Sequence, residues 1–227
     1  MRRDVLIFGC DAPYGTAIAR RLTSDGWRVA GIVHRESAYA NDFPVLALEP
    51  LDSADLATAI EQRLPDFRPQ GMVVIPRRPS IAPIAATQAE DFVAAADEAL
   101  VGTEIAARYL LSTPKRSSAA RLVLLSGWAA MGLPGGSTAA AIMGGLLGLA
   151  RSWAIELAPS GITVNAVVAG AGLEGSNWAR ALPPAGRHPT DDEVAHAVGF
   201  FLDERSAAIN GQVLFVCGGL TPGIIPV

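Results

Sequence analysis

The segment LIFGCDAPYGTAIARRL, residues 6–22, decides the fold of this 227-residue chain. A short apolar run ends at Gly9, a turn that contains Pro13 and Gly15 follows, and a helical segment begins after it. Strand, tight turn and helix in this order are typical of the first unit of a parallel sheet, in which backbone amides at the positive end of the helix hold a pyrophosphate. We therefore predict a nucleotide-type turn at residues 9–15.

Seven short apolar runs alternate with longer helical segments along the chain. The runs lack strong inside/outside alternation, which is typical of parallel strands that helices cover on both faces. We predict one doubly wound α/β domain over residues 1–227, with a seven-stranded parallel sheet flanked by helices. The predicted strands are Val5–Phe8, Val29–Val33, Val45–Leu48, Met72–Ile75, Leu122–Leu125, Thr163–Val168 and Val213–Val216.

Three helix starts carry capping signals. Thr87 with Glu90, and Thr190 with Glu193, match a capping box, in which a hydroxyl and a carboxylate satisfy the first free amides of a helix. Ser137 and Thr138 precede an apolar segment, and we interpret them as caps of the helix that begins there.

Composition and charge narrow the class of protein. Half of the residues are apolar and the formal net charge is −4, without a one-faced basic stripe, so we expect a globular protein with no nucleic-acid partner. The first apolar run is broken by Gly9 and Asp11, and the run at 139–150 is shorter than the ~20 residues that cross a bilayer. We predict a cytoplasmic protein without a membrane segment, in which Cys10 and Cys217 are reduced structural thiols and no metal site is present.

Three segments of the second half carry a family resemblance. RLVLLSGWAAMGLPG (121–135), GLLGLARSWAIELAPSGITVNAVVAG (145–170) and INGQVLFVCGG (209–219) resemble blocks of the short-chain dehydrogenases/reductases, most of all the β-ketoacyl-acyl-carrier-protein reductases. The likeness spans nearly the whole chain. It implies a Rossmann-type fold and a turn of the form Gly-x-x-x-Gly-x-Gly, whose first and third glycines fall on Gly9 and Gly15.

The resemblance implies a nicotinamide cofactor, but the turn departs from the family pattern. Pro13 replaces the middle glycine and offers no amide hydrogen, and Asp11 adds a negative charge beside the expected phosphates. Arg35 stands where members that prefer NADP place a cation for the 2′-phosphate, and Glu49 matches an acidic residue near the adenine. Each is also explained as a solvated loop residue. The sequence predicts either NADP at a weakened site or no cofactor.

After the fourth predicted strand the family has Asn-Asn-Ala-Gly, and this chain has IPRRPS, residues 75–80. Arg77 and Arg78 would fill the nucleotide site or contact an anionic small-molecule ligand. The alternative is that both are solvated loop arginines.

The catalytic residues of the family do not match. The resemblance places its Tyr-x-x-x-Lys pair on Ala139 and Met143, its asparagine on Ala99 and its serine on Ser126. Alanine and methionine cannot protonate a carbonyl oxygen or lower the pKa of a proton donor, so the usual mechanism is absent and enzyme activity is uncertain. Ser126 could orient a carbonyl or bind local backbone groups. The tyrosines and the lone lysine of the chain lie elsewhere, at Tyr14, Tyr39, Tyr109 and Lys115.

The same resemblance bears on assembly. The family packs its fourth and fifth helices between subunits, and Gly144, Gly145 and Gly148 would let such helices approach closely, although packing within the chain also explains them. The last strand resembles a second dimer edge, followed by the apolar tail Ile224, Ile225 and Val227. The substrate lid is shortened and carries Pro183, Pro184 and Pro189.

These features predict a non-catalytic partner or regulatory subunit of an active reductase of the same fold, as a homo-oligomer or as a hetero-oligomer with an active paralogue. One alternative is an enzyme of non-redox biosynthetic chemistry, such as cyclisation, dehydration or isomerisation, in which Ser126 and the paired arginines contact the substrate. A further alternative is an atypical NADP-dependent ketoreductase.

Overall fold

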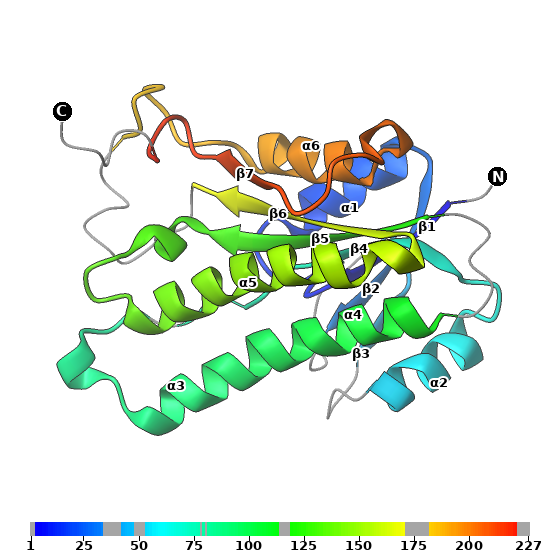
Figure 1. Ribbon diagram of the computed structural model, residues 1–227, viewed down its shortest axis with the longest axis horizontal. Helices are drawn as coiled ribbons and strands as arrows, with labels where there is room; N and C mark the ends of the chain where they lie inside the picture. Colours follow the sequence, from blue (N-terminus) through cyan, green and yellow to red (C-terminus); the bar gives the residue numbers. More distant parts are fainter. Residues whose placement is uncertain are drawn as a thin grey trace.

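The computed structural model describes residues 3–33, 42–47, 53–77, 79, 81–113, 119–170 and 182–221. Their strands form a seven-stranded sheet in the order β3-β2-β1-β4-β5-β6-β7, in which every neighbouring pair is parallel, as Figure 1 shows. The predicted α/β class and sheet are confirmed. The strands are β1 Arg3–Phe8, β2 Trp27–Val33, β3 Val45–Ala47, β4 Pro69–Val74, β5 Ala120–Gly127, β6 Ile162–Ala169 and β7 Val213–Val216.

Five of the seven strands begin earlier than the apolar runs that predicted them, whereas β3 and β7 begin at the predicted residues. Arg3 pairs with Trp27, and Asp4 pairs with Arg28, in the ladder between β1 and β2. Ladder hydrogen bonds join backbone groups and continue through polar residues, whereas a hydrophobicity pattern marks only the part of a strand that is buried on both faces.

Helices cover the sheet in two layers (Figure 1). α1 and α6 pack against one face, and α2, α4 and α5 pack against the other, each with its own apolar cluster. Both faces of the sheet are therefore buried, which explains the near-continuous apolar strands. The helices are α1 Gly15–Ser24, α2 Ser53–Arg63, α3 Ala89–Ala96, α4 Gly102–Ser112, α5 Ser137–Glu156 and α6 Asp191–Leu202, and the 3₁₀ turns are η1 Ile84–Ala86, η3 Trp128–Met131, η4 Ala158–Ser160 and η6 Glu204–Ser206.

One of the predicted caps is correct. Thr190 and Glu193 form a complete capping box at the start of α6. The predicted box of Thr87 is wrong, because its hydroxyl donates to the carbonyl of Pro83 and α3 starts one residue later, from Gln88. The prediction at Ser137 and Thr138 is also wrong, because α5 starts from Gly136 without a side-chain cap.

Helix α5 is the central helix of its layer. Within the described part of the chain it is the one helix long and apolar enough to cross a membrane, but 44% of its most apolar window is buried inside the protein. It packs against β5 and β6, which identifies it as a core helix. Its other side carries Gly144 and Gly148, and a methyl group added at either glycine would meet no atom within 4 Å.

The segment between α3 and α4 is a wide turn of the same continuous helix. This π-turn, η2, runs from Asp97 to Val101 and has helical backbone angles at both ends. Ala99 is its buried residue. The turn lies where the sequence placed the family asparagine.

Candidate functional site

The predicted site residues gather at the carboxyl ends of the central strands. The strand order reverses between β1 and β4, and such a switch point is where doubly wound sheets bind ligands. The turn after β1, the chain after β4 and Ser126 at the end of β5 all border one cavity there. Of the predicted site residues, Gly9, Gly15 and Ser126 therefore lie at this edge of the sheet.

Both glycines of the turn are required by the turn itself. Gly9 has a φ of +70°, and a Cβ on it would lie 2.1 Å from the carbonyl oxygen of Ile75. A Cβ on Gly15 would lie 2.0 Å from the carbonyl oxygen of Cys10. These close backbone approaches keep the strand-turn-helix geometry of a nucleotide site.

The amide groups of the turn are poorly arranged for a pyrophosphate. The amide of Ala12 donates to Gly9 O at 2.9 Å and the amide of Gly15 donates to Ala12 O at 3.0 Å, so both are used inside the turn. Pro13 has no amide hydrogen. Tyr14, the residue before α1, has a φ of 74° and is the one non-glycine residue with a positive φ in the described ranges. Its side chain is buried.

The cavity between this turn and the sheet is very small. Its volume is about 30 Å³, which is room for about two water molecules. The lining residues are Pro13, Tyr14, Ile75, Pro76, Leu125, Ser126, Gly127, Met143 and Ala169.

Ser126 and Met143 close the cleft from the side of β5. The Ser126 hydroxyl donates to the backbone carbonyl of Met143 at 2.9 Å, and the residue is 4% exposed. The Met143 side chain lies over Gly127, where an added Cβ would be 3.6 Å from its sulfur. Ala139 and Met143 belong to an apolar cluster with residues of η3. The serine thus binds a local backbone group, and its neighbours form a packed core.

Ala99 lies in η2 and is also buried. Its carbonyl oxygen accepts a hydrogen bond of 2.6 Å from the Thr103 hydroxyl, which is buried as well. The methyl side chain of Ala99 offers no polar group that could hold a proton-relay water.

Arg77 is directed toward η2. Its guanidinium lies 3.5 Å from the carboxylate of Glu98, and both side chains are partly exposed. Arg77 is not among the residues that line the small cavity. The predicted positions Arg35, Glu49 and Arg78 lie outside the described residues.

Two buried ionisable groups among the described residues have raised pKa values. Burial, and then the charge of Asp11, raise the pKa of the Cys10 thiol to about 12, so it remains protonated at neutral pH. Burial also raises the pKa of Tyr109, which packs in the α4 layer. No group of three or more potential metal ligands occurs in the ranges that the structure describes.

The comparisons with known proteins define the class of protein. Residues 71–221 match the family described as enoyl-(acyl carrier protein) reductase. This segment includes β4 to β7 and thus most of the chain. The chain belongs to this family of short-chain dehydrogenases/reductases.

Solved structures are similar over nearly the full chain. An oxidoreductase of the short-chain dehydrogenase/reductase family from Burkholderia thailandensis has a TM-score of 0.86 at 23% identity, with 98% of this chain and 94% of that chain covered. The aldohexose dehydrogenase of Thermoplasma acidophilum has a TM-score of 0.86 at 19% identity, with 100% and 96% covered. A short-chain dehydrogenase/reductase variant from Serratia marcescens has a TM-score of 0.80 at 22% identity, with 96% of each chain covered. At these identities the likeness shows the fold.

Sequence reasoning missed the position of Tyr14. It considered Pro13 for its missing amide hydrogen, but the neighbouring Tyr14, with its left-handed backbone and buried ring, also lines the small cavity. A left-handed tyrosine has no sequence signal, because only glycine, asparagine and aspartate adopt this conformation readily.

Proposed function

We propose that this chain is a short-chain dehydrogenase/reductase subunit without redox activity, which works in the cytoplasm as a partner of an active reductase of the same fold. One observation carries the proposal: the space between Ser126, Met143 and the turn at Pro13 is about 30 Å³. Carbonyl reduction requires a nicotinamide ring and a substrate carbonyl in contact at that place, with a proton donor beside them. Ala139 and Met143 supply no such donor.

The alternative of a non-redox enzyme would rely on Ser126 and the paired arginines. The Ser126 hydroxyl donates to Met143 O, and Arg77 pairs with Glu98, so these groups do not converge on a common point. An atypical NADP-dependent reductase would need the same space as the usual one. The contacts of the described residues favour neither alternative.

Exposed small and apolar residues support the partner role. Gly144 and Gly148 form a flat surface on α5, and Ile155 near the end of this helix is 80% exposed. Val93 on the neighbouring helix α3 is 63% exposed. A continuous surface of this kind is typical of subunit contacts. We propose that the surface of α3 and α5 binds a second subunit.

A titration of the purified protein with NADPH, followed by calorimetry and by cofactor fluorescence, tests the loss of redox function. We expect no saturable binding at millimolar NADPH, because the site for the reactive half of the cofactor is filled. Saturable micromolar binding would refute this part of the proposal.

The partner role is tested by purification of a tagged chain from its native source, with identification of the associated proteins by mass spectrometry. We expect an active reductase of the same fold in a defined stoichiometry. A tryptophan at Gly148 (Gly148→Trp) should abolish the complex because it fills the flat surface, whereas Ala57→Trp on the exposed side of α2 should not. A chain that remains monomeric and alone would contradict the partner role.

A further inference from the structure

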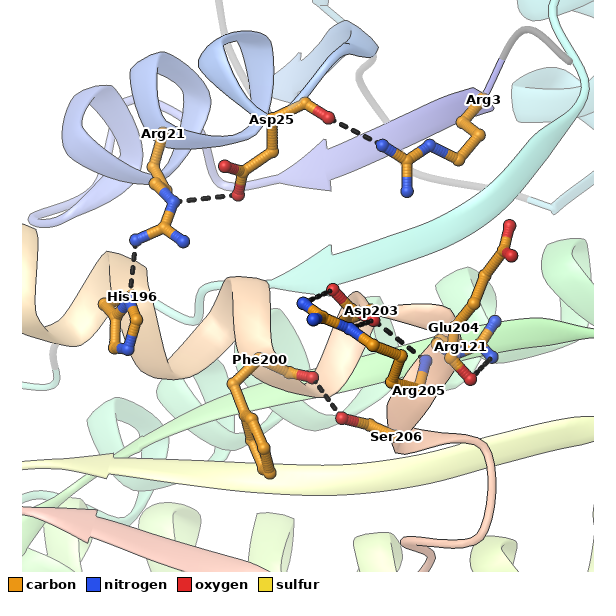
Figure 2. A network of polar contacts seen from close by, with 10 residues as sticks. All are labelled: Arg3, Arg21, Asp25, Arg121, His196, Phe200, Asp203, Glu204, Arg205 and Ser206. Carbon is orange, nitrogen blue, oxygen red and sulfur yellow. Dashed lines mark hydrogen bonds and ion pairs between the residues drawn. The ribbon is translucent and has the colours of Figure 1, made fainter.

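A second cavity lies away from the cleft, between α1, α6 and η6. Its volume is about 530 Å³, much larger than the cavity at the cleft. It is bordered by the carboxyl end of α6 and the amino ends of β1 and β2, so it is at the opposite end of the sheet. Figure 2 shows the polar network at this place. Its lining includes Arg3, Arg21, Trp27, His196, Phe200 and Arg205.

The carboxylates of this network are already neutralised. Asp25 accepts the Nε–H of Arg21 at 2.8 Å, and Asp203 accepts Nε–H and Nη2–H of Arg205 at 2.9 and 2.8 Å (Figure 2). Hydrogen bonds from Arg205 lower the pKa of the Asp203 carboxyl, and the nearby charge of Arg3 lowers it further. Both aspartates are paired with arginines, and the guanidiniums of the lining keep further N–H groups that can donate to a ligand.

The imidazole of His196 adds one more donor. Nη1 of Arg21 lies 2.7 Å from Nδ1 of His196. Arginine can only donate, so Nδ1 accepts and the ring hydrogen must be on Nε2. Nε2–H is then directed away from Arg21, as the ring orientation in Figure 2 shows.

Two guanidinium groups here have no carboxylate partner within the described ranges. Arg3 lies over the ring of Trp27, 4.8 Å from its centroid, and donates to the backbone oxygen of Asp25 at 2.6 Å. Arg121 is 6% exposed, its Nε is buried without a described partner, and its Nη2 donates to the oxygen of Glu204 at 3.3 Å. Arg121 is not part of the cavity lining, in which the three guanidiniums of Arg3, Arg21 and Arg205 lie beside the two carboxylates of Asp25 and Asp203. The lining therefore carries an excess of positive charge, although the whole chain has a net charge of −4.

Apolar groups complete the cavity. Phe200 is 44% exposed at its edge, and Trp27 and Ile209 form part of the lining. Gly199 of α6 lies beside them without a side chain. A Cβ at this position would lie 3.3 Å from a carboxylate oxygen of Asp25. The cavity combines convergent cationic donors with an aromatic surface, which is typical of sites for organic anions.

We propose that this cavity binds a phosphate monoester with an apolar body, whose dianion contacts the guanidiniums of Arg3 and Arg205 and whose body packs against Phe200. The phosphate supplies the acceptor oxygens that the donor groups lack, and Arg binds such oxygens in a bidentate manner. The inference does not depend on the proposed function, because it concerns the opposite end of the sheet and needs no cofactor.

Calorimetric titration with phenyl phosphate, in low salt and with chloride as the ionic-strength control, tests the site. We expect saturable one-to-one binding. Arg205→Gln and Arg3→Gln should each weaken it about tenfold, which corresponds to the loss of one charge-assisted hydrogen bond of roughly 1.4 kcal/mol. Arg151→Gln makes the same change of charge at an exposed position of α5 and should weaken it less than twofold.

The outcomes separate the sources of the anion. Inorganic phosphate that binds much more weakly than phenyl phosphate identifies an organic ligand, and equal affinity identifies free phosphate, so that the apolar part of the proposal is overturned. No saturable binding of either probe at millimolar concentration, or equal weakening by Arg151→Gln, overturns the site. Arg205 is exposed, so its replacement should leave the fold intact. If Arg3→Gln unfolds, Arg205→Gln still tests the site, and a circular dichroism spectrum shows that this variant is folded.

Discussion

At the scale of single residues, Glu193 is the side chain with the most partners at a helix start. It accepts two hydrogen bonds from Arg187, at 2.8 and 2.7 Å, and one from the amide of Thr190 at 2.8 Å. The Arg187 hydrogen bonds, followed by that of Thr190, lower the pKa of the Glu193 carboxyl to about 2. The ion pair with Arg187 and the capping box with Thr190 therefore share the carboxylate of Glu193.

Acid should therefore weaken the start of α6. A carboxyl whose pKa is lower in the folded state stabilises the protein above its unfolded pKa, and this contribution is lost as the pH falls toward about 2. We expect Glu193→Gln to be less stable than the wild type at pH 6 and to lose less stability between pH 4.5 and 2. Urea unfolding at several pH values measures both effects. Glu90→Gln, an exposed change on α3, is the control, and an equal pH dependence of both variants would contradict the prediction.

Gly15 and Gly144 provide a matched pair of substitutions. A methyl group at Gly15 would lie 2.0 Å from a backbone oxygen, and one at Gly144 would meet nothing within 4 Å. Gly15→Ala should cost at least about 2 kcal/mol of the free energy of unfolding because backbone must move. Gly144→Ala should gain about 0.5–1 kcal/mol from helix propensity. Chemical denaturation tests both values, and a harmless Gly15→Ala would show that the turn is not closely packed.

The two cysteines should differ in reactivity. Cys217 is buried, which raises its pKa, but hydrogen bonds from Thr221 and from backbone amides of residues 219–221 outweigh burial and lower the pKa overall. Cys10 has a pKa of about 12. Because the thiolate is the nucleophile, iodoacetamide at pH 7.5 should label Cys217 first, as peptide mass spectrometry can show. Faster labelling of Cys10 in the folded protein would contradict these surroundings.

At the scale of elements, the sequence predicted every strand but not every helix start. Strands such as β5, Ala120–Gly127, bury both faces, and their buried part appears directly as an apolar run in the sequence. Helix starts depend on which residue first adopts helical angles, and Thr87 has the right composition for a cap but bonds backward to Pro83 O instead. Local backbone geometry decides between these two uses of a threonine hydroxyl.

Reintroduction of the tyrosine and lysine of the family into α5 should not produce reductase activity. Ala139 and Met143 are each 6% exposed, and the cavity beside them has a volume of about 30 Å³. The double variant Ala139→Tyr/Met143→Lys would add a large ring and a buried ammonium, so we expect a loss of about 3 kcal/mol or more and no reductase activity. Thermal unfolding and an NADPH oxidation assay measure the two outcomes. Activity with retained stability would show that the cleft can open.

At the scale of the whole molecule, the fold was predictable and the state of the site only in part. Ser126 and Met143 line the small cavity at the cleft, Ala139 packs in the apolar cluster beside it, and Ala99 lies in η2. The small size of this cavity was not predictable, because the cavity arises from segments more than 100 residues apart in sequence that meet only in the folded sheet. The Arg3–Arg21–Arg205 network was missed for the same reason, since no local pattern links its residues.

The melting temperature of the chain should be independent of nucleotide. A ligand that binds only the folded state raises stability in proportion to the logarithm of its concentration, and the proposed function predicts that NADPH does not bind. We expect no shift at millimolar NADPH in differential scanning calorimetry, with an active reductase of the same fold as the positive control. A shift of several degrees that grows with NADPH concentration would argue for a nucleotide site.

The wide turn η2 determines how α3 is rotated about the helix axis relative to α4. A π-turn contains one residue more than an α-helical turn, and each residue rotates a helix by about 100°. None of the eight residues of α3 is buried, whereas α4 on the other side of the turn buries a full stripe. Deletion of Ala99 would restore a regular helix and rotate α3 by about 100° against α4. The presence of one residue in η2 therefore decides which side chains of α3 face outward. The surface that α3 offers to a partner depends on this rotation as well as on residue type.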